Sequence, residues 1–119
     1  MKVAEDIPEA IFAMHAKVCK TLADPKRLRI INILRDGEMT VGQMAHSLGL
    51  RQANLSQHLM LLRERGVVTT RRQGLNIYYS LSSFKIIQAC DIMREVLAEH
   101  LARSAQLSEE LQAAVGAKL

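Results

Sequence analysis

Side chains that can recognise the bases of a nucleic acid gather between positions 52 and 58. Glutamine and asparagine can each form a pair of hydrogen bonds with adenine, and serine and histidine can reach bases or phosphates. The leucines of this stretch, Leu55, Leu59 and Leu62, recur at helical spacing, so the polar side chains occupy the other faces of a predicted helix. The residues that we predict to face base edges are Gln52, Asn54, Ser56, Gln57 and His58.

Arginines surround this polar stretch and could hold a polyanion. Positions 51–76 carry five arginines and a single acidic residue, whereas positions 91–110 carry five acidic residues and two arginines. Arginine often binds phosphates or enters a narrow minor groove, which positions a protein on DNA without specifying a sequence. We predict contacts of this kind for Arg51, Arg63, Arg71 and Arg72, with a further DNA contact from Gln73. The alternative for each single residue is an ordinary solvated side chain.

Apolar periodicity and turn residues predict the elements that position these side chains. Gly49 and Gly66 would each end a helix, Gly74 would supply the positive φ of a hairpin loop, and Asp24 with Pro25 would start a helix. The predicted segments are helices over 8–23 and 25–35, a helix-turn-helix over 40–66, a hairpin over 67–81, a long helix over 84–105 and a further short helix within 108–119. The predicted fold class is mainly α with a small β-hairpin, in the order α-α-α-α-β-β-α, which is a winged helix-turn-helix.

The composition fits one small domain over residues 1–119. A content of 49% hydrophobic and 3% aromatic residues suits a helical core, and the net charge of +4 is compatible with a polyanionic partner. The chain lacks a glycine-rich phosphate loop and the usual nucleophile and metal-site motifs, so we expect no enzyme. It also lacks an apolar run that could span a membrane and a signal peptide, so we expect a cytoplasmic protein whose cysteines form no permanent disulfide.

Several segments recur together in a recognisable pattern. They are Leu22–Ile30, Val41–Ala45, Leu55–Leu59 with Leu62 and Arg63, Gly66–Val68, and Arg71–Gly74 leading into Tyr78–Leu81. Over roughly residues 10–100, this pattern resembles the ArsR/SmtB-type bacterial transcriptional repressors. The resemblance implies a homodimer that uses its first and last long helices as the interface, binds an imperfect inverted repeat in double-stranded operator DNA and blocks transcription. It also implies an inducer, most often a metal ion, an arsenical or a reactive sulfur or oxygen species, that weakens DNA binding.

The chain departs from this family at several informative positions. Arg51 stands where the family often has serine and therefore cannot cap the recognition helix as serine would. Relatives that bind arsenic or cadmium have two cysteines where this chain has Thr40 and Gly42, so that site is absent. The last long helix lacks the two-histidine spacing of the zinc or cobalt sensors, and Asn32 stands where persulfide sensors carry one of their cysteines.

The remaining candidates for sensing are Cys19 on the first long helix and Cys90 on the last. Because these helices pack together in the dimers of the family, the thiols could close to a disulfide or polysulfide bridge, or bind a thiophilic metal or metalloid. His15 lies one turn before Cys19 and could complete a metal site. The alternative is that both cysteines are small apolar core residues. Three functions remain open: a thiol-based sensor of reactive sulfur or oxidants, a metal- or metalloid-responsive repressor, and a DNA-binding regulator or architectural module without an inducer.

Overall fold

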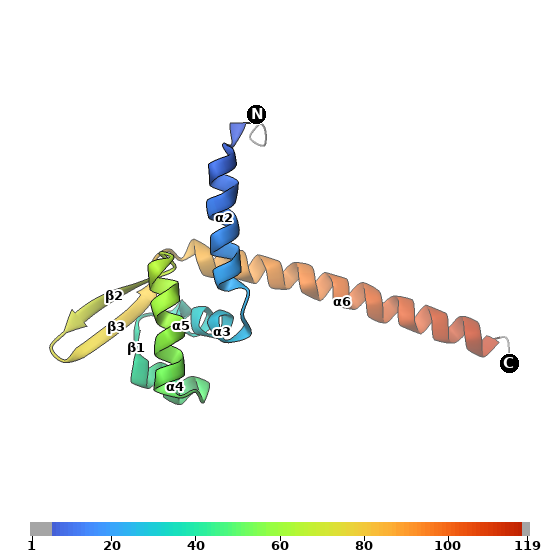
Figure 1. The fold of residues 1–119 in the computed structure, drawn as a ribbon. Helices are drawn as coiled ribbons and strands as arrows, with labels where there is room; N and C mark the ends of the chain where they lie inside the picture. Colours follow the sequence, from blue (N-terminus) through green and yellow to red (C-terminus); the bar gives the residue numbers. More distant parts are fainter. Residues whose placement is uncertain (1–5, 118–119) are drawn as a thin grey trace. The chain divides into compact units, whose positions relative to one another are not determined.

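The computed structural model describes residues 6–117 as two compact units that meet between Phe84 and Lys85. The elements of the first unit are α2 (Glu9–Leu22), α3 (Pro25–Ile33), the 3₁₀ turn η1 (Leu34–Asp36), β1 (Met39–Thr40), α4 (Val41–Leu48), α5 (Gln52–Glu64), β2 (Val68–Gln73) and β3 (Asn76–Leu81). The second unit is the single helix α6 (Lys85–Ala117) (Figure 1). The predicted fold class, mainly helical with a small hairpin, is confirmed.

Local interactions start α3 and α4, and end α4, at the residues that the sequence predicts, whereas the predicted helix over 25–35 gives way to η1 after Ile33. The Asp24 carboxylate accepts hydrogen bonds from the backbone N–H groups of Lys26 (2.9 Å) and Arg27 (3.1 Å), and so caps α3. A capping box starts α4: the backbone N–H of Gln43 donates to Thr40 Oγ1, and that of Thr40 donates to Gln43 Oε1. Gly49 ends α4 in the left-handed region at φ 65°.

A three-stranded antiparallel sheet forms the wing, with strand order β1-β3-β2. Strand β3 lies in the centre, because Thr40 of β1 pairs with Tyr78, and Arg71 of β2 pairs with the same Tyr78 on its other side. Strand β1 is not predicted from the sequence, because two residues are too few to show an alternating pattern. The hairpin itself runs through Gly74 at φ 62°, in agreement with its predicted role.

The core of the first unit lies between α3, α4, α5 and β2, and α5 contacts each of the other three. The predicted leucine stripe of α5 is fully buried there, as are Ile30 and Ile31 of α3, Met44 of α4 and Val68 of β2. Leu55, Leu59 and Leu62 therefore fix which face of α5 turns away from the core. Helix α2 differs, because its large apolar side chains Ile11, Phe12, Met14 and Val18 are all exposed.

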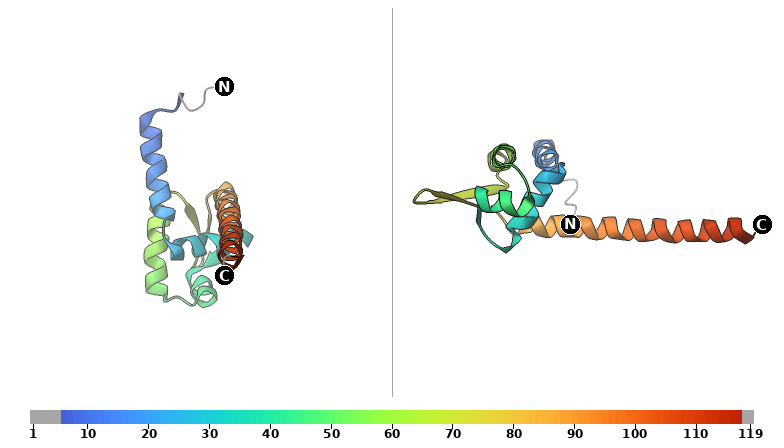
Figure 2. Two further views of the ribbon diagram at one scale, coloured as in Figure 1. Left: turned by 90° about the vertical axis from the view of Figure 1, so that its right-hand side faces the viewer. Right: turned by 90° about the horizontal axis from the view of Figure 1, so that it is seen from below.

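Helix α6 is longer than the sequence predicts. The predicted helix over 84–105 and the predicted short helix within 108–119 are one uninterrupted helix as far as Ala117, so the predicted break is wrong (Figure 2). Its physical reason is that residues 85–115 contain no proline or glycine, and serine alone does not end a helix. Residues 118–119 of the predicted short helix, and residues 1–5 of the predicted domain, lie outside the described part of the chain.

Candidate nucleic-acid interface

Helix α5 presents a polar face opposite its buried leucines. The predicted base-reading residues Gln52, Asn54, Ser56 and Gln57 are all exposed, and so are the predicted phosphate contacts Arg51 and Arg63. Arg51 occupies the N-cap position and its side chain makes no capping hydrogen bond, as its sequence departure predicts. The exposed polar side chains therefore lie together on the first half of α5, beside an uncapped helix start that favours negative charge.

The start of α5 lies against the start of α4. A Cβ atom added to Gly42 would lie 3.7 Å from Nε2 of Gln52, in ordinary van der Waals contact. Gln52 therefore extends over the first turn of α4, where Gly42 and the Thr40 cap are found. The two helix N-termini form one continuous surface, which matches the way a helix-turn-helix meets DNA.

His58 differs from the other predicted base readers, because its ring is half-buried and bound to α3. Nη1 of Arg27 lies 3.4 Å from Nδ1 of His58, and Nε of Arg27 donates to the carbonyl oxygen of Thr21 (2.5 Å). Because a guanidinium can only donate, this contact is a hydrogen bond in the tautomer whose Nδ1 is free to accept. Arg27 thus joins α5 to the end of α2. Sequence reasoning missed this role, since 31 residues separate Arg27 from His58.

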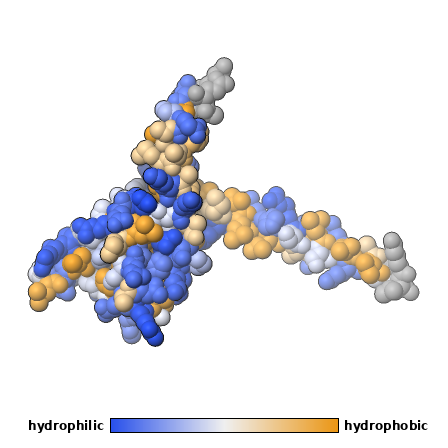
Figure 3. All heavy atoms as spheres, viewed as in Figure 1, coloured by the Kyte–Doolittle hydropathy of each residue, from blue (hydrophilic) through white to orange (hydrophobic). Residues whose placement is uncertain are grey.

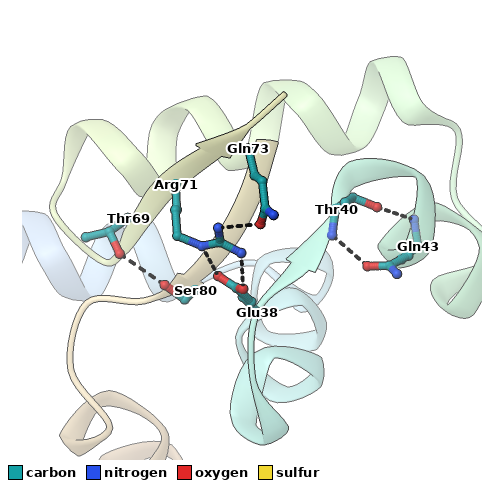
Figure 4. Close-up of polar contacts among 7 residues, drawn as sticks. All are labelled: Glu38, Thr40, Gln43, Thr69, Arg71, Gln73 and Ser80. Carbon is teal, nitrogen blue, oxygen red and sulfur yellow. Dashed lines mark hydrogen bonds and ion pairs between the residues drawn. The ribbon is translucent and has the colours of Figure 1, made fainter. Parts of the chain in front are cut away.

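Arg71 of β2 is held at each of its guanidinium nitrogens. Nε donates to Oε2 of Glu38 (3.1 Å), Nη2 donates to Oε1 of Glu38 (2.5 Å), and Nη1 donates to Oε1 of Gln73 (2.8 Å) (Figure 4). The guanidinium carbon also lies 4.7 Å from the centroid of the Tyr78 ring. The hydrogen bonds from Arg71 lower the pKa of the Glu38 carboxyl, and the same pairing raises the pKa of Arg71.

Arg72 lies on the opposite face of the hairpin from Arg71. Side chains alternate along a strand, so Arg72 shares its face with Val68, whereas Arg71 shares its face with Thr69 and Gln73. Arg72 is exposed, and within the hairpin its Nε donates to the carbonyl oxygen of Gly74 at 3.3 Å. The two adjacent arginines, which the sequence predicts to act alike, therefore have different surroundings.

The predicted sensor residues are divided between the two units. Cys19 is an exposed free thiol on α2, one turn after the exposed His15, and Cys90 is a half-buried free thiol on α6. Within residues 6–117, no three His, Cys, Asp or Glu side chains gather into a group that could hold a metal ion. The tentative site of His15, Cys19 and Cys90 stays a prediction. No helix that the structure describes is both long and apolar enough to cross a membrane.

Comparisons with known proteins agree with this geometry. A family model described as "Bacterial regulatory protein, arsR family" matches residues 24–70. The HTH-type transcriptional regulator Rv0081 of Mycobacterium tuberculosis is 38% identical over 106 residues, which cover 88% of this chain and 93% of that protein.

Two solved structures are also similar. One is the homodimeric winged helix-turn-helix DNA-binding domain Mb0332 of Mycobacterium bovis, a possible ArsR-family regulator (TM-score 0.72, 31% identity, 81% of this chain and 89% of that one). The other is the transcriptional repressor BigR of Xylella fastidiosa (TM-score 0.67, 36% identity, 74% of this chain and 90% of that one).

Proposed function

Since the chain belongs to the ArsR family of bacterial transcriptional regulators, we propose that it acts as a homodimeric repressor that reads an imperfect inverted repeat through α5 and the wing. The observation that carries this proposal is the exposed polar face of α5, opposite its buried leucines and beside the wing. The protein is a DNA-binding regulator and not an enzyme, as predicted. Because a bacterial regulator must reach the genome, we place it in the cytoplasm.

Base recognition would come from the exposed amides and hydroxyl of α5. Gln52, Asn54 and Gln57 can each form two hydrogen bonds with adenine, and Ser56 can reach a base or a phosphate. His58 keeps only its Nε2 atom for such a contact, because its Nδ1 faces Arg27. Arg51, Arg63 and Arg72 would bind phosphates around them and supply the salt-dependent part of the affinity.

Exposed apolar side chains on α2 and α6 support a dimer interface in these helices. Apolar residues lie along both helices in Figure 3, and monomers rarely expose large contiguous apolar surfaces. On α2 the exposed side chains are Ile11, Phe12, Met14 and Val18, and on α6 they are Ile92, Met93, Val96, Leu97, Leu101, Leu107, Leu111 and Val115. Mb0332 is homodimeric, and a twofold axis would place two copies of α5 on the two halves of an inverted repeat.

Cys19 and Cys90 lie on these two helices, so we propose that they sense reactive sulfur or an oxidant. Each thiol would lose its proton and the pair would form a disulfide, with two electrons passing to the oxidant. With a polysulfide as the reagent, the polysulfide accepts these two electrons, releases sulfide and can leave one of its sulfur atoms inserted between the two cysteines as a polysulfide bridge. An exposed thiol such as Cys19 is accessible to a reagent before any bridge forms. The second candidate is a thiophilic metal or metalloid, favoured by His15 one turn before Cys19.

The test measures binding to a duplex selected for high affinity from a randomised pool, with a scrambled duplex as the control. The reduced protein, the polysulfide-treated protein and the protein with a thiophilic metal ion are compared, each in wild type, Cys19→Ser and Cys90→Ser. A loss of affinity in treated wild type that both variants abolish supports the sensor, and the effective reagent identifies the signal class. Unchanged affinity under every treatment rejects thiol sensing while leaving DNA recognition intact.

A further inference from the structure

We propose that Arg71 is a positioning residue, which fastens the wing to the start of the helix-turn-helix through Glu38, and that Arg72 alone of this pair contacts a phosphate. The inference rests on the proposed mode of DNA binding. It assigns different roles to two adjacent arginines that share one type of side chain. It also gives a role to Glu38, an acidic residue that pairs with the basic hairpin.

Each guanidinium nitrogen of Arg71 already donates a hydrogen bond within the protein. Nε and Nη2, the two nitrogens that form its fork, donate to the two carboxylate oxygens of Glu38, and Nη1 donates to Gln73. The Tyr78 ring contacts the guanidinium as a cation–π partner. A phosphate would have to compete with a bidentate carboxylate, which satisfies the guanidinium with the same geometry that a phosphate offers. It would also find the charge of Arg71 largely compensated by Glu38.

The contacts of the Arg71 side chain also extend across all three strands of the sheet. Arg71 lies on the outer strand β2, its cross-strand neighbour Tyr78 lies on the central strand β3, and Glu38 immediately precedes β1 on the far edge (Figure 4). Thr40, two residues after Glu38, pairs with Tyr78 and caps α4. The contacts of Arg71 therefore join the outer edge of the wing to the segment from which the helix-turn-helix begins.

The side chains of Arg72 and Gln73 differ from Arg71 in what they leave available for DNA. Arg72 projects from the other face of the hairpin, and its only guanidinium contact that the hairpin supplies is one long hydrogen bond to the Gly74 carbonyl (3.3 Å). A phosphate could replace this bond at little cost. Arg71 instead holds the Gln73 amide at 2.8 Å, so that it orients a polar side chain close to the tip of the wing.

The experiment measures the slope of log affinity against log salt on the selected duplex, because this slope counts the phosphates that a protein neutralises. Arg72→Ala should reduce the slope by about one, whereas Arg71→Ala should leave it unchanged. Arg71→Ala should still weaken binding by about tenfold, the loss expected when one base contact from Gln73 is misplaced. Arg71→Lys should behave like Arg71→Ala, because lysine retains the charge but cannot form the fork.

Glu38→Gln completes the design, since it replaces one of the two acceptor oxygens with an NH2 group, which can only donate. We expect it to weaken binding, and the double variant Glu38→Gln with Arg71→Ala to bind no worse than Arg71→Ala alone. Asp36→Asn is the matched control, because it removes one negative charge two residues away. Thermal unfolding of each variant separates a misplaced wing from a loss of folding.

Two results would overturn this inference without contradicting operator recognition. One is a salt slope that falls by about one in Arg71→Ala but keeps its wild-type value in Arg71→Lys. The other is a gain of affinity in Glu38→Gln that exceeds the gain in Asp36→Asn. Either would show that Glu38 masks a genuine phosphate contact. A wild-type protein that binds selected and scrambled duplexes equally would instead contradict the proposed operator recognition, and the inference would fall with it. The two failures are therefore distinguishable.

Discussion

Replacing Leu97 with alanine tests the proposed dimer interface at the centre of the apolar stripe of α6. The Leu97 side chain is 54% exposed in the single chain, so about half of its surface remains available to a partner. Alanine is the best helix former, and an exposed position leaves no cavity in the chain itself. The substitution should therefore leave α6 intact and remove only what Leu97 contributes between subunits.

The expected magnitude follows from the exposed fraction. Complete burial of a leucine side chain contributes about 2 kcal/mol, so burial of the exposed half contributes roughly 1 kcal/mol per subunit. A symmetric dimer contains two copies of Leu97, which gives about 2 kcal/mol in total. Since each 1.4 kcal/mol changes an equilibrium constant about tenfold, the dissociation constant of the dimer should rise by about 30-fold.

Sedimentation equilibrium of the reduced protein over a range of concentrations gives the dimer dissociation constant, and circular dichroism checks that helix content is retained. Leu75→Ala is the control, because Leu75 at the tip of the wing is 96% exposed and receives the same chemical change. If Leu97→Ala moves the dissociation constant no further than Leu75→Ala does, the proposed interface on α6 is refuted. Leu97→Glu, which would place a charge in the same proposed interface, should leave only monomers.

Two further results are expected. Gln57→Ala should reduce the preference for the selected duplex over a scrambled duplex by roughly 1–3 kcal/mol in a competition assay, and an equal loss on both duplexes would assign Gln57 to a phosphate instead. Hydrogen bonds from the backbone of Arg27, and then of Lys26, lower the pKa of Asp24. Asp24 therefore stabilises the fold above its ordinary pKa of 3.8, and this stabilisation is lost as the pH falls through the lowered value. Asp24→Asn retains a cap and should flatten that acidic part of a plot of melting temperature against pH; an unchanged plot would contradict the assigned role of the carboxylate.

The elements that local patterns define could be predicted from the sequence. Leu55, Leu59 and Leu62 gave the buried face of α5, and Asp24 and Gly49 gave the boundaries of α3 and α4. Each of these signals lies within one or two turns of the structure that it determines. The exposed polar face of α5 follows from the same periodicity.

The contacts that link distant parts of the chain could not be predicted in this way. Glu38 and Arg71 are 33 residues apart, and nothing near either residue indicates that the other is its partner. The same reason hid the contact between Arg27 and His58. Alternation alone places Arg71 and Arg72 on opposite faces, but the register of β2 with β3, which only pairing fixes, decides that Arg71 is the one beside Tyr78. The roles of Cys19 and Cys90 depend on a second subunit and stay predictions.

Thr40 belongs to two structures at once, because it pairs with Tyr78 in the sheet and closes the capping box of α4. Fraying of β1 from β3 would move Thr40, whose hydroxyl accepts a hydrogen bond from the backbone N–H of Gln43 in the first turn of α4. The hairpin and the start of α4 therefore share one cooperative opening event, and their amide protons should exchange with solvent as a single unit. DNA that orders the wing would then slow exchange in the first turn of α4 as well, even where α4 itself touches nothing.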